Sequence, residues 1–342
     1  MGAVGPNERV YSVSKLAAIV HALRREGIST AAGLRGTGLA ERDLHESATR
    51  VSFEQMARVC RNALALSTDP HFAYHTGSRF HLSTYGMYGF AILSSTDFRE
   101  AIAFALQYYQ LAMPLVDTSC REERHRLIWM LSPREALDTT VSRFILELEM
   151  AILTALHRDC ISPSLVPLEA HLPFSAPRDA RVYPDMFACR VLFDQDAARM
   201  IFDSKWLDTE PAYGNEIAHQ ELLILCEQLM EELRLRVGIA GKVREILLMN
   251  RMLPMSFSAV AKQLNMTGRT LRRKLGVERT SFRQILADLR IRLAIKYLRD
   301  TELSIEDISH KLGFSENASF RHAFHRWTKM APLKYRDRAR KG

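Results

Sequence analysis

Hydrophobic residues recur at helical spacing through much of the last third of the chain. Between Ser281 and Asp300 there is neither Pro nor Gly, and apolar residues return every three or four positions. This pattern predicts one helix of about 19 residues, roughly 28 Å long. The apolar positions are Phe282, Ile285, Leu286, Leu289, Leu293, Ala294 and Tyr297.

The segments before and after this helix repeat one another. Each begins with a serine that can cap a helix. Each ends its apolar run at Asn or Gly, the residues that best tolerate a left-handed helix end. A small residue, Ala261 or Ser309, stands where two helices would approach closely. The aligned pairs are Ser256 with Ser304, Val260 with Ile308, Ala261 with Ser309, Leu264 with Leu312, Asn265 with Gly313, Met266 with Phe314 and Thr267 with Ser315.

A second helix follows in each copy, after a turn that is one residue longer in the second copy. Thr267 and Ser315 can cap these helices, and apolar residues four apart mark the buried face of each. Helix, tight turn and helix are thus written twice, a pattern typical of DNA-binding domains. The long helix between the copies would hold them near the spacing of about 34 Å between successive major grooves. The buried-face pairs are Leu271 with Leu275 and Phe320 with Phe324.

The first two-thirds of the chain mix helix-like and strand-like patterns. Residues 97–114 predict an amphipathic helix with Thr96 or Asp97 as its cap. Residues 125–131 and 164–174 predict strands. Helices flanking a small sheet, an α+β domain, follow from these patterns.

We therefore expect three parts: an effector-sensing α+β domain over residues 1–212, a helical linker over 213–237, and an all-α double helix-turn-helix domain over 238–342. A helix predicted for residues 216–236 carries a short apolar stripe. Such a stripe can join two chains in a homodimer or pack on the chain's own sensor domain. Its members are Leu222, Leu225, Cys226, Leu229 and Leu233.

Charge divides the chain near the same place. The whole chain has a net charge of +8, but residues 239–342 hold 23 Lys and Arg against 9 Asp and Glu. That segment therefore has a net charge of +14, and the residues before it have −6. This asymmetry favours a polyanionic partner for the basic end.

Other function classes find little support in the sequence. No run nears the roughly 18 apolar residues of a membrane span, and residues 1–10 lack a secretory layout, so we expect a cytoplasmic protein with no membrane partner. Five widely separated cysteines indicate free thiols rather than a zinc site. Without GxSxG, P-loop or HExxH motifs, we expect no enzyme activity, metal or cofactor. An enzyme fused to a DNA-binding tail is the alternative from another class.

The segments RTLRRKL, TSFRQIL and LAIKYL, followed by SIEDISHKLGFSENASFRHAFHRWTKMAPLKYR, closely resemble the C-terminal domain of AraC/XylS-type transcription regulators. This resemblance covers residues 238–338. Residues 83–116 and 189–208 are similar to the arabinose-binding-type sensor domain of one branch of that family. The resemblance implies a regulator that binds a double-stranded DNA operator, works with RNA polymerase and responds to a small-molecule effector. Control by abundance or by a protein partner, without an effector, is the alternative.

The resemblance also assigns DNA contacts. Arginine reads guanine through O6 and N7, so we expect the arginine-rich first recognition helix to be the main reader. His322 stands where the family usually has Arg and would make a weaker contact than a forked guanidinium. Arg279 and Lys329 stand where the family often has Gly. The expected base contacts are Gly268, Arg269, Arg272, Arg273, Asn317, Ala318, Ser319 and His322, and the expected phosphate contacts, which position the protein, are Lys274, Arg321, Arg326, Lys334 and Arg336.

One aromatic stretch of the N-terminal part is a candidate effector site. The stretch RFHLSTYGMYGF contains Arg79, His81, Tyr85 and Tyr88. An arginine with tyrosines can hold a carboxylate, so these four residues are the expected effector contacts and a carboxylate is the expected ligand class. The same residues can instead be core aromatics and a surface arginine.

Overall fold

The computed structural model describes residues 4–134, 137–249, 255–278 and 280–339. It divides into an N-terminal unit of residues 6–231 and a C-terminal unit that comprises the residues from 232 onward and also takes in the start of the chain up to Gly5. Each unit has its own buried hydrophobic residues. Arg279, one departure from the family pattern, lies outside the described residues.

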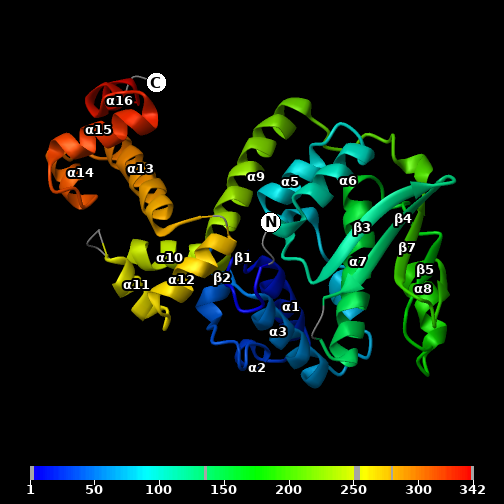
Figure 1. Ribbon diagram of the computed structural model, residues 1–342. Coiled ribbons are helices and arrows are strands. Elements are labelled where there is room, and N and C mark those ends of the chain that lie inside the picture. The colour runs from blue at the N-terminus through cyan, green and yellow to red at the C-terminus, as the bar shows by residue number, and fades with distance from the viewer. Residues whose placement is uncertain (1–3, 135–136, 250–254, 279, 340–342) are drawn as a thin grey trace. The chain divides into compact units, whose positions relative to one another are not determined.

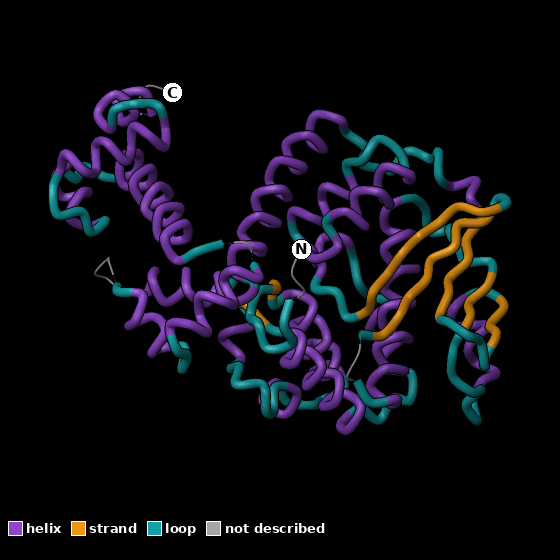
Figure 2. The backbone as a smooth tube through the Cα atoms, viewed as in Figure 1, coloured by secondary structure: helices purple, strands orange, loops and turns teal. Residues whose placement is uncertain are grey.

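A five-stranded sheet in the order β3-β4-β7-β5-β6 forms one part of the N-terminal unit (Figure 2). Neighbouring strands are antiparallel except β5 and β6, which are parallel. The strands are β3 (Val116–Glu123), β4 (Arg126–Pro133), β5 (Glu169–His171), β6 (Arg190–Leu192) and β7 (Ala198–Asp203). A separate antiparallel pair joins β1 (Tyr11–Ser12) and β2 (Arg50–Val51).

Helices pack on this sheet and build the rest of the unit (Figure 1). The longest, α7 (Thr139–Cys160), contacts β3, β4, α3 and α4. A Cβ added at Gly77 on α4 would lie 2.5 Å from the carbonyl oxygen of Leu148 on α7, so only glycine permits this close approach. The other helices are α1 (Ser14–Arg25), α2 (Thr30–Gly33), α3 (Phe53–Leu66), α4 (Phe72–Gly77), α5 (Met87–Leu93), α6 (Phe98–Gln107), α8 (Tyr183–Phe187) and α9 (Glu216–Arg236), whose residues from 232 onward belong to the C-terminal unit. Short 3-10 helices are η1 (Glu41–Leu44), η2 (Leu82–Tyr85), η3 (Tyr109–Ala112), η4 (Ala180–Val182) and η5 (Ser204–Trp206).

The predicted elements of this unit are present, with two corrections. Asp97 caps α6, accepting from the amide of Glu100 at 2.7 Å, but the helix ends at Gln107 instead of residue 114, because a 3-10 turn and left-handed Met113 (φ 55°) follow. The strand predicted for residues 125–131 is present as β4. The strand predicted for 164–174 shrinks to β5, because Pro167 cannot donate to a sheet ladder.

Helix α9 has the predicted bounds, but its apolar stripe is only partly right. Cys226 and Leu233 are buried, as expected. Leu225 is 42% exposed, and buried His219 and Met230 complete the inner face instead.

Seven helices are described in the C-terminal unit (Figure 1). They are α10 (Gly238–Met249), α11 (Phe257–Gln263), α12 (Gly268–Val277), α13 (Phe282–Asp300), α14 (Ile305–Lys311), α15 (Asn317–Thr328) and α16 (Pro332–Ala339). Two separate hydrophobic clusters form the core. Helix α13, the predicted long helix, contributes Ile285 and Leu289 to the first and Ala294 and Leu298 to the second.

The duplicated helix signals are confirmed except at Ser315. The side chains of Ser256, Thr267, Ser281 and Ser304 cap α11, α12, α13 and α14. The turns are left-handed at Asn265 (φ 52°) and Gly313 (φ 72°). Ser315 does not cap α15, whose preceding residue is Glu316 with no side-chain cap, because the longer second turn moves the helix start by one residue.

Candidate nucleic-acid interface and candidate ligand cavity

The first recognition helix, α12, has two opposite faces. Leu271 and Leu275 are buried in the first cluster, which turns Arg269, Arg272 and Arg273 outward, and all three are exposed, as is Lys274. A row of guanidinium groups on the outer face can donate to base edges and phosphates.

Two local contacts shape the start of α12. The guanidinium carbon of Arg272 lies 5.4 Å from the ring centre of Phe257. A Cβ at Gly268 would lie 3.1 Å from the ring of the same phenylalanine. The close packing of Phe257 therefore favours glycine at position 268. This is a structural reason for the glycine, in addition to the base contact expected from the sequence.

The second recognition helix, α15, is less charged. Ala318, Ser319 and His322 are exposed, and Asn317 is half-buried with its Oδ1 atom lacking a partner among the described residues. Phe320 and Phe324 are fully buried in the second cluster. Trp327 and Tyr335 pack against that cluster, so their rings contribute to the core of the second unit.

The expected phosphate contacts divide into two groups. Arg321, Arg326 and Lys334 are exposed. Arg336 is half-buried and donates from Nη2 to the carbonyl oxygen of Leu303 at 2.5 Å, so part of its donor capacity serves the fold. Lys329 ends α15 in the left-handed region at φ 58°, the conformation for which glycine is better suited.

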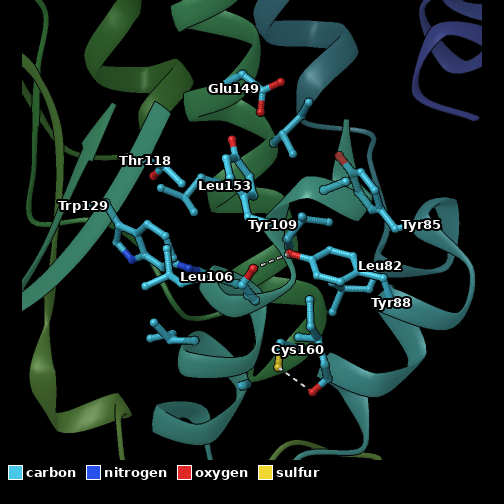
Figure 3. A pocket seen from close by; sticks show the side chains of 18 of the residues that line it. Leu82, Tyr85, Tyr88, Leu106, Tyr109, Thr118, Trp129, Glu149, Leu153 and Cys160 are labelled. Atoms are coloured by element: carbon cyan, nitrogen blue, oxygen red, sulfur yellow. Dashed lines mark hydrogen bonds between the residues drawn. The ribbon is translucent and has the colours of Figure 1, made fainter. Parts of the chain in front are cut away.

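A cavity of about 90 Å³ lies in the N-terminal unit between α1, α5, α6, α7, the 3-10 helices η2 and η3, and strands β3 and β4 (Figure 3). Roughly 10–15 Å³ is enough to hold one water, so this cavity has room for a small molecule. Its wall is mostly aliphatic and aromatic. The apolar members include Leu82, Ile92, Ile102, Leu106, Leu131, Ile152, Leu153 and Leu156.

An ion pair lines one end of the cavity. The Nζ atom of Lys15 on α1 lies 2.7 Å from Oε1 of Glu149 on α7, and the two side chains are 2% and 6% exposed. The same Nζ donates to the carbonyl oxygen of Met113 at 3.2 Å. The pair joins segments that are far apart in the sequence. The positive charge of Lys15 and the negative charge of Glu149 balance each other.

Two tyrosine hydroxyls face this end. In Figure 3 the hydroxyls of Tyr85 and Tyr109 point toward the side of the cavity where Glu149 lies. Among the described residues neither hydroxyl has a hydrogen-bond partner. Burial, together with the nearby Glu149 carboxylate, raises the pKa of both phenols well above their usual value. Both therefore remain protonated and able to donate.

Two nitrogen atoms of the cavity-lining residues also lack partners. Nε1 of Trp129 and Nδ1 of His157 are buried without a hydrogen bond among the described residues. The ring centres of these residues lie 5.3 Å apart. Buried polar atoms without partners are uncommon in folded proteins, and a ligand in the cavity would offer these two nitrogen atoms a partner.

The buried imidazole of His157 should make the stability of the N-terminal unit sensitive to acid. Burial lowers the pKa of His157 to about 3, below the value of about 6.5 in an unfolded chain. The stabilisation of the neutral ring is therefore fully present above pH 6.5 and is lost as the pH falls toward 3. We expect this residue to remove about 2 kcal/mol of unfolding free energy between pH 6 and pH 4.5.

Urea unfolding of wild-type protein and a His157→Phe variant at several pH values measures this effect. The variant should lose less stability on acidification, whereas His45→Gln, at an exposed position, should match the wild type. Equal acid sensitivity in wild type and His157→Phe would show that His157 is not the buried neutral group.

The residues expected from the sequence as effector contacts separate in the structure. Tyr85 and Tyr88 line the cavity, and the Tyr88 hydroxyl donates to the carbonyl oxygen of Ala105 at 2.9 Å. Arg79 and His81 do not line it. His81 pairs with Asp159 at 3.2 Å, and Arg79 lies along a different surface hollow. The arginine that suggested a carboxylate ligand is thus not in this cavity.

Several cavity residues carry no signal in the sequence. Lys15, Tyr109, Trp129, Glu149 and His157 come together only through the fold. The one local hint is that a lysine and a glutamate lie on the apolar faces of their helices.

Among the described residues, no group of three or more His, Cys, Asp or Glu side chains could hold a metal ion. No described helix is long and apolar enough to cross a bilayer.

Comparison with known proteins agrees with this geometry. Residues 27–211 match the family described as the arabinose-binding domain of AraC transcription regulators, N-terminal, and residues 260–338 match a helix-turn-helix domain family. The ornithine utilization regulator of Pseudomonas aeruginosa is 31% identical over 293 residues, which cover 84% of this chain and 85% of that protein. An uncharacterized HTH-type transcriptional regulator of Mycobacterium tuberculosis is 28% identical over 97% of this chain and 98% of its own length.

The fold agrees with a solved structure over nearly the whole chain. The crystal structure of the transcriptional regulator CdpR from Pseudomonas aeruginosa aligns with a TM-score of 0.50 at 23% identity, covering 95% of this chain and 98% of that one. The α+β N-terminal unit, the duplicated helix-turn-helix units and the two family matches lead to one assignment. The chain belongs to the AraC-type transcription regulators that carry an N-terminal arabinose-binding-type domain.

Proposed function

We propose that this regulator recognises its operator mainly through α12. The observation that carries the proposal is the exposed arginine row of Arg269, Arg272 and Arg273, fixed in direction by the buried Leu271 and Leu275. Forked guanidinium groups suit guanine in the major groove. Helix α15, with Asn317, Ala318, Ser319 and His322, would add weaker base contacts and position the second unit.

The proposed phosphate contacts are the exposed side chains near these helices. They are Lys274, Arg321, Arg326 and Lys334. We propose the division into a sensor over residues 1–212, a linker over 213–237 and a DNA-binding domain over 238–342. Partners would be double-stranded DNA and RNA polymerase in the cytoplasm, with α9 as a candidate homodimer contact.

The proposal predicts a base-specific loss on changing Arg272. Arg272→Ala should weaken operator binding by about 1–3 kcal/mol, roughly 5- to 150-fold, and relax the preference at one base pair. Fluorescence anisotropy with the operator and single-base variants measures both effects. Arg299→Ala is the matched control, because it also removes one positive charge but lies on α13, where Arg299 pairs with Asp300 at 2.6 Å. Equal base preference in Arg272→Ala and wild type would reject this residue as a reader.

We also propose that a small molecule in the N-terminal cavity controls DNA binding. A ligand shifts the regulator only as far as its affinity differs between DNA-competent and incompetent forms. Operator affinity measured with and without cell metabolite extract tests this control, and an extract that leaves it unchanged favours regulation by abundance or a protein partner.

One relative's name offers a ligand that the cavity does not favour. Ornithine, for which the Pseudomonas aeruginosa relative is named, carries two ammonium groups and one carboxylate at neutral pH. The charged groups of the cavity, Lys15 and Glu149, already neutralise each other. The cavity of this chain therefore does not favour ornithine as its ligand.

A further inference from the structure

The charge balance of the cavity restricts what can enter it. Lys15 and Glu149 are its charged lining residues, and they contact each other at 2.7 Å while nearly fully buried. A ligand with a net charge would have to break this pair or remain without a counter-ion. Both cost free energy in a buried site, since an unpaired charge there is poorly solvated.

Neutral groups of the lining also offer hydrogen-bonding capacity. Tyr85 and Tyr109 have hydroxyls without partners among the described residues, near the Glu149 end (Figure 3). Trp129 Nε1 and His157 Nδ1 are buried and also lack partners there. Phenol and indole groups are donors, so they suit an acceptor such as a carbonyl oxygen without requiring an anion.

The apolar residues that line the rest of the cavity determine which kind of ligand body fits. Leucine and isoleucine side chains from η2, α5, α6, α7 and β4 line the cavity together with aromatic rings. Such a wall favours an aromatic ring or a short aliphatic chain, whose apolar surface leaves water on binding.

We propose that this cavity takes an uncharged ligand with an apolar body and one carbonyl or amide group, which accepts from the hydroxyls of Tyr85 and Tyr109. This inference rests on the proposed function, since it names the ligand class of the same cavity. It replaces the carboxylate expected from the sequence, because Arg79 lies elsewhere.

A matched set of probes tests the ligand class. Toluene, phenylacetamide, phenylacetate and phenethylamine share one ring and differ in polar group and charge. Isothermal titration of the full chain at pH 7 should show binding of phenylacetamide at least tenfold tighter than that of either charged probe. Phenylacetate or phenethylamine binding as tightly as phenylacetamide would overturn the inference, as would no binding of phenylacetamide.

Variants identify the contacts. In the Tyr85→Phe/Tyr109→Phe double variant, phenylacetamide affinity should fall at least tenfold, whereas toluene, which needs no polar partner, should still bind and so report an intact cavity. Tyr213→Phe, at a site 71% exposed and outside the cavity lining, should bind both probes as the wild type does. Unchanged phenylacetamide affinity in the double variant would overturn the proposed contacts.

The two proposals fail separately. If metabolite extract alters operator affinity but a charged probe binds tightest, effector control stands and the ligand class falls. If extract leaves operator affinity unchanged, effector control falls, whatever the probes show.

Discussion

Glu149→Leu is expected to destabilise the N-terminal unit by about 3–5 kcal/mol, because it leaves the ammonium group of Lys15 buried without its carboxylate. Among the described residues, Lys15 would keep the carbonyl oxygen of Met113 at 3.2 Å and the Tyr85 ring, whose centre lies 5.7 Å from Nζ, but no carboxylate. Lys15→Met should be similarly costly, since it leaves the Glu149 carboxylate uncompensated. Hydrophobic replacement of a whole buried pair is often neutral or stabilising.

The double variant Lys15→Met/Glu149→Leu should therefore recover most of the loss. Urea unfolding of the full chain, followed by tryptophan fluorescence and read as a double-mutant cycle, gives the coupling between the two side chains. Arg24→Met with Glu41→Leu is a matched control, because that pair is 3.5 Å apart but exposed and should contribute less than about 1 kcal/mol. Additive losses at Lys15 and Glu149 would mean that the pair is not a closed buried contact.

Arg290→Ala should disorder the second helix-turn-helix unit while leaving the first folded. From α13 the Arg290 guanidinium donates to the carbonyl oxygens of Leu312 and Gly313 at 2.9 and 3.0 Å and lies 4.5 Å from the Phe314 ring centre. Removing it deletes two charge-assisted hydrogen bonds and leaves two carbonyl groups without this donor, at a cost of roughly 3 kcal/mol.

The effect should be local because the two hydrophobic clusters are separate. Hydrogen exchange should accelerate at the amides of Phe320 and Phe324 but not at Leu271 and Leu275, and the footprint on DNA should shorten to one half-site. Arg299→Ala, on the exposed end of the same helix, should leave both patterns unchanged. Uniform acceleration across both clusters would contradict the independence of the two units.

The C-terminal helices could be predicted closely because their signals are local. Capping side chains such as Ser256 and Thr267 lie next to the helices that they begin, and Asn265 marks its turn by a left-handed conformation. The prediction that Ser315 caps α15 was wrong because it relied on the same local signal. One extra residue in the second turn places Glu316, and not Ser315, at the cap position.

The N-terminal cavity could not be assembled in this way. Lys15 and Glu149 are 134 positions apart in the chain, and no local pattern relates them. Tyr85 and Tyr88 were found because they share one short aromatic stretch, but the same stretch also supplied Arg79 and His81, whose side chains take other directions. Helix contacts across the fold, rather than neighbours in sequence, determine which residues line the cavity.

Selection of bound DNA from a random pool tests the central claim most directly, namely that α12 is the main reader of two units held by α13. The wild type should enrich two short motifs roughly 10 base pairs apart. Arg272→Ala should change the preference at one base pair of one motif only, while Arg299→Ala should enrich the wild-type sequence. No enriched motif, or the same motif with and without Arg272, would contradict the account.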